Sequence, residues 1–128
     1  MQDPKELDRA FAALARQRTE ALVVVADGMF LAQRDRIITL AARSRLPGMY
    51  PSTDLVEAGG LMAYSVNLPE MYRGGASYVD RILKGARPAD LPVERPTRFH
   101  FVINFRTAKA LGLTIPPSLL LKADRIIE

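Results

Sequence analysis

The stretch ALVVVA, residues 21–26, decides the fold class of this chain, and Asp27 and Gly28 follow it directly. Six apolar residues in a row, three of them valine, predict a short strand buried on both faces, as strands of parallel sheets are. An Asp-Gly pair is typical of a turn and ends the strand. The centre of the fold is therefore expected to be a parallel sheet.

Helical patterns lie on both sides of this strand. Asp3 is a predicted N-cap, and the apolar stripe that follows it predicts a helix ending near Gln17. A second helix is predicted from about Gln33 to Arg43, and a second short strand over residues 47–50. Because helix and strand alternate, we expect an α/β layer with flanking helices.

The rest of the chain gives weaker signals, apart from the alternating run that begins at Phe99. Gly74 and Gly75 weaken the prediction of a helix around them, since glycine in a helix costs about 1 kcal/mol relative to alanine. In chain order we expect a helical turn over 55–58, a strand over 61–65, a helix over 68–84 capped by Asn67, an extended connector over 86–97, a half-buried strand over 99–105, a short helix capped by Thr107, and a last helix from Ser118 to Ile127.

Composition excludes several classes of protein. The chain has 128 residues, no cysteine and a net charge of +4, with basic residues scattered rather than clustered, so we expect one folding unit without a nucleic-acid surface. The apolar stretch at 21–32 is too short to span a bilayer, so membrane insertion is not expected. His100 is the only histidine, and no phosphate loop or nucleophile motif occurs. We therefore predict no enzyme, metal or cofactor.

Three stretches together carry a family resemblance. They are YPSTDLVEAGGLMAYSVNLPEMYR (50–73), YVDRILKGARPADLP (78–92) and FVINFRTAKALGLTIPPSLLLKADRIIE (101–128). The chain resembles the substrate-binding proteins of a bacterial ABC-transporter family, some of whose members handle aromatic amino acids. The resemblance implies a two-lobed, periplasmic-binding-protein-like fold of type I that closes over a small solute and presents it to a membrane permease.

The resemblance places this chain in the C-terminal half of such a protein. Residues 1–58 would then be a βα segment of the second lobe, and residues 59–128 would cross towards the first lobe and add the last strand and helices. The family is periplasmic, but the N-terminus lacks a secretory pattern, so the chain as given is expected to stay in the cytoplasm. Two alternatives remain open: a truncated, non-binding domain that forms a homodimer, and a cytoplasmic regulatory or enzymatic βαβ domain.

The candidate solute site follows from the rule that ligands bind at the carboxyl ends of the strands in open α/β sheets. An acidic group there would bind an ammonium group, aromatic rings would line a cleft, and hydroxyl groups would bind a carboxylate. Capping, turn formation and core packing are the ordinary alternatives for the same residues. The candidates are Asp27, Phe30, Tyr50, Ser52, Tyr64 and Ser65.

A hinge is expected where the chain would leave the second lobe. Glu57 precedes Gly59 and Gly60, and paired glycines allow unusual dihedral angles or a close backbone approach. A plain turn is the alternative. The hinge depends on the family resemblance.

Overall fold

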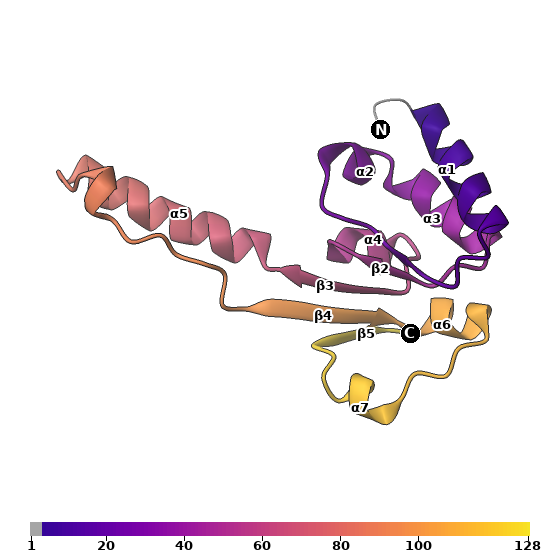
Figure 1. The fold of residues 1–128 in the computed structure, drawn as a ribbon. Helices are drawn as coiled ribbons and strands as arrows, with labels where there is room; N and C mark the ends of the chain where they lie inside the picture. Colours follow the sequence, from indigo (N-terminus) through magenta and orange to yellow (C-terminus); the bar gives the residue numbers. More distant parts are fainter. Residues whose placement is uncertain (1–3) are drawn as a thin grey trace. The chain divides into compact units, whose positions relative to one another are not determined.

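The computed structural model describes residues 4–128 and confirms an α/β fold (Figure 1). The predicted cap Asp3 lies outside the described residues. The elements are α1 (Pro4–Arg16), β1 (Leu22–Val23), α2 (Gly28–Ala32), α3 (Arg34–Arg43), β2 (Gly48–Tyr50), α4 (Thr53–Glu57), β3 (Met62–Val66), α5 (Leu68–Leu83), a 3₁₀ turn (Pro88–Asp90), β4 (Phe99–Asn104), α6 (Phe105–Leu111), α7 (Pro117–Leu120) and β5 (Arg125–Ile127).

The five strands form one sheet in the order β1-β2-β3-β4-β5. β1 pairs with β2 in parallel, β2 with β3, and β4 with β5, whereas β4 runs in the opposite direction to β3 (Figure 1). The register places Val23 beside Met49, and Met49 beside Met62. Because β1, β2 and β3 are adjacent and parallel, their carboxyl ends lie at one edge of the sheet.

Contacts divide the chain into two compact units. Unit 1 comprises the chain up to Ser65 together with His100–Glu128, and unit 2 comprises Val66–Phe99. The sequence-based boundary at residues 58 and 59 lies inside unit 1, and the assignment of the segments to lobes stays a prediction.

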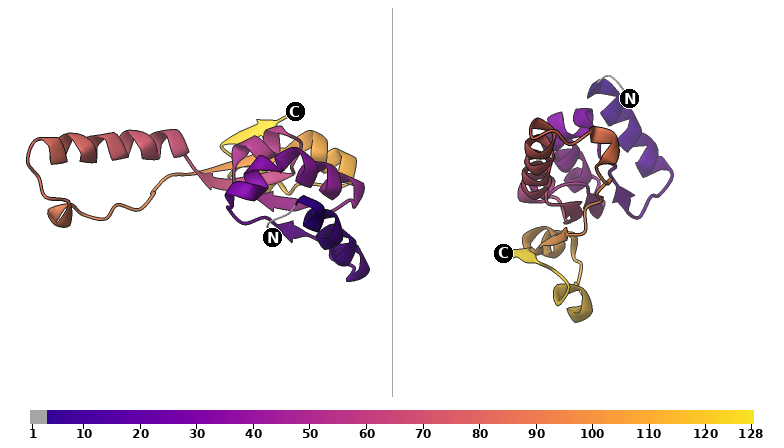
Figure 2. Two further views of the ribbon diagram at one scale, coloured as in Figure 1. Left: turned by 90° about the horizontal axis from the view of Figure 1, so that it is seen from above. Right: turned by 90° about the vertical axis from the view of Figure 1, so that its left-hand side faces the viewer.

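Helices of unit 1 lie on both sides of its sheet (Figure 2), and a hydrophobic core lies on each face. Helices α1, α3 and α4 supply one core, around Leu7, Ile37 and Leu55, which packs on Ala63 and Val102. The second core joins Leu61 and Ile103 to Ala108 of α6 and Ile115. β4 takes part in both cores because the side chains of Val102 and Ile103 point to opposite faces.

The prediction that the ALVVVA strand is buried on both faces is wrong. Leu22 is half-buried, but Val23 is 76% exposed and Val25 is 65% exposed. β1 is the outer strand of the sheet, and the cores described above do not cover this side of it. An apolar run predicts that a strand forms, but whether both faces are covered depends on the helices that pack on it.

The C-terminal elements also differ from the prediction. The last helix is only α7, and residues 125–127 form β5, which pairs with β4. The Asp124 side chain accepts a hydrogen bond from the Phe101 amide (2.8 Å), and the Asp124 amide donates to the Phe101 carbonyl (2.8 Å), which aligns the chain with the sheet. The cap of α6 is Asn104, whose side chain accepts from the Thr107 amide, so Thr107 is not the cap.

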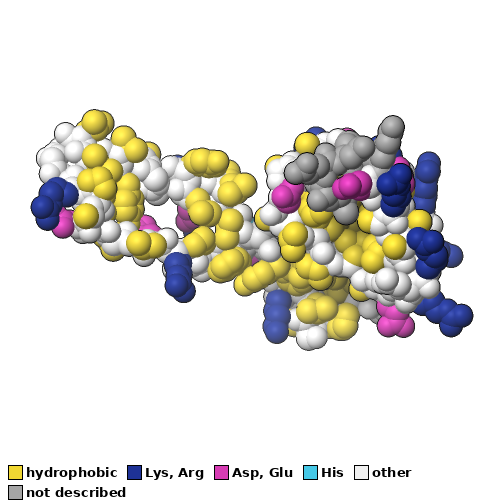
Figure 3. All heavy atoms as spheres, turned by 45° about the horizontal axis from the view of Figure 1, so that its top comes forward, with side chains coloured by type: hydrophobic (Ala, Val, Ile, Leu, Met, Phe, Trp, Pro, Cys, Tyr) yellow, Lys and Arg dark blue, Asp and Glu magenta, His cyan; other side chains and the backbone are white. Residues whose placement is uncertain are grey.

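Unit 2 consists of α5 and the segment that returns from it. The predicted cap is confirmed, because Asn67 Oδ1 accepts from the Glu70 amide (3.1 Å). Gly74 and Gly75 do not interrupt α5, which continues to Leu83 before Gly85 turns the chain with φ of 101°. No residue of α5 is buried, and hydrophobic side chains cover much of the surface that unit 2 presents in Figure 3.

Among the described helices, none has the length and apolar character needed to cross a membrane.

Candidate functional site

The edge at which β1, β2 and β3 end brings several predicted site residues to one side of unit 1. Asp27 follows β1 and is the N-cap of α2, since its Oδ1 accepts a hydrogen bond from the Met29 amide (2.8 Å). Its second carboxylate oxygen makes no bond to any described residue. Asp27 is exposed, and a Cβ at Gly28 would meet nothing within 4 Å, so solutes have free access to this carboxylate.

Ser52 lies at the same edge, two residues after the end of β2. It stands at the N-cap position of α4, but its side chain makes no capping hydrogen bond. The Oγ atom is buried and has no partner within the described part of the chain. A buried hydroxyl group without a partner costs about 1–3 kcal/mol, so a rearrangement of this edge that uncovers the Ser52 hydroxyl would favour its hydrogen bonding to a polar ligand atom.

β3 brings Tyr64 and Ser65 to opposite faces of the sheet. Tyr64 is 56% exposed, and its ring stands edge-on to Phe101 with 6.4 Å between the ring centroids. Ser65 is buried on the other face. Tyr64 therefore offers an accessible aromatic surface.

Phe30 is half-buried and packs against the core of unit 1. It also lines a pocket of about 310 Å³ between α1, β1 and α3, together with Leu14 and Leu22. The pocket is not lined by the other strand-end candidates Asp27, Ser52, Tyr64 and Ser65. Phe30 therefore does not belong to the same site as these residues.

Tyr50 belongs to the core. Its side chain is 2% exposed, and burial raises its pKa to about 12. A Cβ at Gly48 would lie 2.6 Å from the Tyr50 hydroxyl oxygen, and one at Gly60 would lie 2.7 Å from its ring. The ring is therefore held in a slot between two glycines and points back along β2, so the structure does not support a place for Tyr50 in a cleft wall at the strand ends.

The predicted hinge residues are tied to the C-terminal part of unit 1. Glu57 pairs with Arg125 of β5 (2.7 Å), and the Gly59 carbonyl accepts a hydrogen bond from Thr107 (2.8 Å). The side-chain Nδ2 of Asn104 donates to the Val56 carbonyl (3.1 Å). Gly59 has φ of 117°, which favours glycine. We call these contacts of Glu57, Val56 and Gly59 with Arg125, Asn104 and Thr107 the clamp. Sequence reasoning missed the clamp, because residues 48 or more positions apart leave no local pattern.

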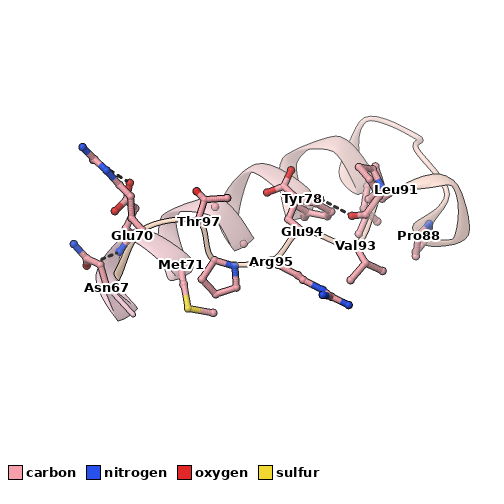
Figure 4. A pocket seen from close by; sticks show the side chains of 16 residues that line it. Asn67, Glu70, Met71, Tyr78, Pro88, Leu91, Val93, Glu94, Arg95 and Thr97 are labelled. Atoms are coloured by element: carbon pink, nitrogen blue, oxygen red, sulfur yellow. Dashed lines mark hydrogen bonds and ion pairs between the residues drawn. The ribbon is translucent and has the colours of Figure 1, made fainter. Parts of the chain in front are cut away.

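Unit 2 contains a pocket that the sequence analysis did not predict (Figure 4). It has a volume of about 520 Å³ and lies between α5 and the segment from Pro88 to Arg98. The Tyr78 hydroxyl donates to the Pro92 carbonyl (2.6 Å), and Arg98 pairs with Glu70 (3.6 Å), so two contacts hold the returning segment beside the helix. Mainly apolar side chains and the open positions at Gly74 and Gly75 face the space.

The described residues contain no group of three or more His, Asp or Glu side chains that could hold a metal ion. His100 lies at the start of β4 and is half-buried.

Comparison with known proteins identifies the family. The model of a family described as ABC transporter substrate binding protein matches residues 1–127. This chain belongs to that family. It is similar over 99% of its length to an ABC domain in complex with L-Trp from Streptococcus pneumonia, with 27% identity and a TM-score of 0.88. It is also similar over 95% of its length to a conserved domain protein from Vibrio cholerae O1 biovar El Tor strain N16961, with 25% identity and a TM-score of 0.87.

A third solved structure shares the fold. The ligand-free, open form of a substrate binding protein with adhesive properties from Clostridium difficile is 19% identical over 99% of this chain, with a TM-score of 0.69. The chain spans 41%, 44% and 42% of the length of the Vibrio, Streptococcus and Clostridium proteins. No curated protein matches it.

Proposed function

We propose that this chain carries part of the solute site of an ABC transporter substrate-binding protein, and that the solute is an aromatic amino acid. The observation that carries the proposal is the edge where β1, β2 and β3 end. One carboxylate oxygen of Asp27 and the hydroxyl oxygen of Ser52 have no partner there among the described residues. Nearby β3 carries the exposed ring of Tyr64.

The chemistry of these groups fits a zwitterion. The Asp27 carboxylate would bind the ammonium group, and the hydroxyl of Ser52 would donate to the carboxylate, whereas Ser65 lies on the face opposite to Tyr64 and has no part in the proposed site. The ring of Tyr64 would lie against the aromatic side chain, which gains from burial of apolar area. The Streptococcus protein, which is bound to L-Trp, supports this class of solute. Tyr50 has no part in the proposed site, and Phe30 lines a different pocket.

Unit 2 would be the segment that crosses to the first lobe, with the crossings near Ser65 and Phe99, where the two units meet along the chain. Solute would favour a closed arrangement of lobes by binding it more tightly than the open one. Glu57, Gly59 and Gly60 would then serve as a fixed base for the hinge. The closed protein would present its solute to a membrane permease from outside the cytoplasm.

The proposal is tested by calorimetric titration of the purified chain with L-Trp, with 3-indolepropionate, which lacks the ammonium group, and with tryptamine, which lacks the carboxylate. We expect saturable binding of L-Trp and weaker binding of both analogues. At a hundredfold excess over Kd, L-Trp should stabilise the fold by about 2.7 kcal/mol.

Asp27→Asn separates the two roles of this residue. Asparagine keeps an oxygen that can cap α2 but removes the charge, so L-Trp should bind at least about tenfold more weakly while 3-indolepropionate is unaffected. Asp35→Asn, which removes an exposed carboxylate from α3, is the matched control and should change neither affinity.

If the folded chain binds none of these compounds, this half does not carry a working site by itself. Mass measurement in solution would then test the second candidate, a homodimer that binds no solute. The exposed apolar side chains of α5, among them Tyr72 and Leu83, favour that candidate. A monomer that binds nothing would contradict both.

A further inference from the structure

A pocket of about 280 Å³ lies in unit 1, away from the edge that carries the proposed solute site. Leu46 and Leu61 line it, and these residues precede β2 and β3. Asp27 and Ser52 instead follow β1 and β2. The pocket therefore lies at the amino ends of the parallel strands, at the opposite edge of the sheet. Leu111 of α6 adds a further apolar wall.

Tyr50 also lines this pocket. Its ring runs back along β2 to a position beside Gly48, which directs the hydroxyl group to the amino end of the strand. The side chain is 2% exposed, and its hydroxyl makes no hydrogen bond to any described residue. The hydroxyl is protonated at neutral pH, as in any tyrosine, and burial raises its pKa further, to about 12. Among the described residues, this donor has no acceptor.

Two arginine side chains complete the lining. Arg45 comes from the loop before β2, and Arg106 comes from the first turn of α6. Neither forms an ion pair with a described residue, and no Asp or Glu lines the pocket. Within the described residues, the pocket thus combines apolar walls, a tyrosine hydroxyl without a hydrogen-bond partner and two arginines without an ion pair.

We propose that this pocket binds a small organic carboxylate with a compact apolar body. The body would lie against Leu46, Leu61 and Leu111. The carboxylate would accept a hydrogen bond from Tyr50 and pair with the guanidinium groups of Arg45 and Arg106, which bind planar carboxylates well. The volume is close to the lower end of the usual range for ligand pockets, about 300 Å³, so the occupant is small. The site is separate from the proposed solute site and does not depend on it.

The test uses benzoate and its uncharged isostere benzamide, titrated against the chain and followed by calorimetry and by amide chemical shifts. Benzoate should bind saturably, shift amides around Arg45 and Arg106, and bind at least about tenfold more tightly than benzamide. Tyr50→Phe keeps the ring in its slot and removes the donor, so it should weaken benzoate about tenfold. Arg45→Ala combined with Arg106→Ala should abolish binding.

The controls are Arg43→Ala, which removes an exposed arginine of α3 outside the pocket, and Asp27→Asn. Both should leave the affinity for benzoate unchanged. The proposal is overturned if benzamide binds as tightly as benzoate, or if Arg43→Ala weakens benzoate as much as the pocket variants do. It is also overturned if benzoate shows no saturable binding to a chain whose circular dichroism is that of the folded protein. Loss of benzoate with Asp27→Asn would place benzoate at the strand-end site instead and would also overturn it.

Discussion

Tyr50 shows how one residue is fixed by its neighbours rather than by its own chemistry. Gly48 and Gly60 leave space on either side of the ring, and no other side chain could stand at those positions without displacing it. The phenol ring is consequently buried beside Leu55 and Val56 in the core of unit 1. Because of this packing, the stability of the fold should depend on the ionisation of Tyr50 and on the size of residue 60.

Alkaline pH should destabilise the fold through Tyr50. Its pKa is about 12 in the folded chain and about 10 when unfolded, so folding favours the protonated form. The stabilisation is complete below pH 10 and is lost as pH rises through 12, with a total on the order of 2 kcal/mol. Urea unfolding between pH 9 and 12, with absorbance at 295 nm to follow ionisation, checks this. Tyr50→Phe should lack this part of the pH dependence, and identical curves for the two proteins would contradict it.

Gly60→Ala should destabilise the fold by about 1–3 kcal/mol. The new Cβ would lie 2.7 Å from the Tyr50 ring and 2.8 Å from the Leu55 carbonyl oxygen, so both the ring and the backbone would have to shift. Gly28→Ala is the control, because a Cβ there meets nothing within 4 Å, and its stability should change by less than about 0.5 kcal/mol. The midpoints of urea denaturation give the comparison, and equal effects at the two positions would exclude the slot as the cause.

At the scale of elements, α6 does more than connect β4 to the C-terminal segment. Its cap Asn104 is buried and bonds both the Thr107 amide and the Val56 carbonyl. Thr107 bonds the Gly59 carbonyl, and Arg125 of β5 pairs with Glu57. The end of α4 and the following turn are thus held by elements that come more than 40 residues later, which fixes the entry of the chain into β3.

Asn104→Ala should cost about 1.5–2.5 kcal/mol. Loss of a helix cap typically costs about 1 kcal/mol, and loss of the side-chain hydrogen bond to the Val56 carbonyl, which keeps the Gly59 amide as a donor, adds about 0.5–1.5 kcal/mol. Lys109→Ala, on an exposed position of the same helix, should cost less than about 0.5 kcal/mol. Denaturant unfolding of both variants provides the measurement, and a cost below about 1 kcal/mol for Asn104→Ala would show that the clamp contributes little.

At the scale of the whole molecule, the two units differ in how much they bury. Unit 1 has a core on each face of its sheet, with Leu55, Val56 and Ile103 fully buried. α5 of unit 2 has no buried residue, and its contacts with the returning segment include those of Tyr78 with Pro92 and of Glu70 with Arg98. α5 is therefore amphipathic, but its apolar side chains do not pack into a buried core of unit 2.

Hydrogen exchange should separate the two units. Amides of α5 should exchange at least about a hundredfold faster than those of β2, β3 and α3, because an element without buried contacts opens at low free energy. Mass-spectrometric exchange on the purified chain measures both in one experiment. Protection of α5 equal to that of β3 would mean that another surface covers the helix, and a dependence of this protection on protein concentration would identify that surface as a second copy.

The sequence alone predicted the local features of this protein. Apolar periodicity located α1, α3 and α5, and the Asn67 cap and Gly85 bounded α5. Short strands were expected at 47–50 and 61–65, where β2 and β3 lie. These features depend on contacts between residues a few positions apart, so they leave a local pattern. The quoted stretches also identified the ABC transporter substrate binding protein family, whose model matches residues 1–127.

Tertiary structure decided what depends on distant residues. Only the folded sheet shows that β1 lies at its edge and that Val23 is exposed. The sequence of a single strand does not determine the position of that strand in the sheet. Residues 125–127 became a strand because β4 and Asp124 align them, although Leu120 and Leu121 suggested a longer helix. Tyr50 points away from the strand ends because two glycines, 12 positions apart in the sequence, make space for its ring in the core.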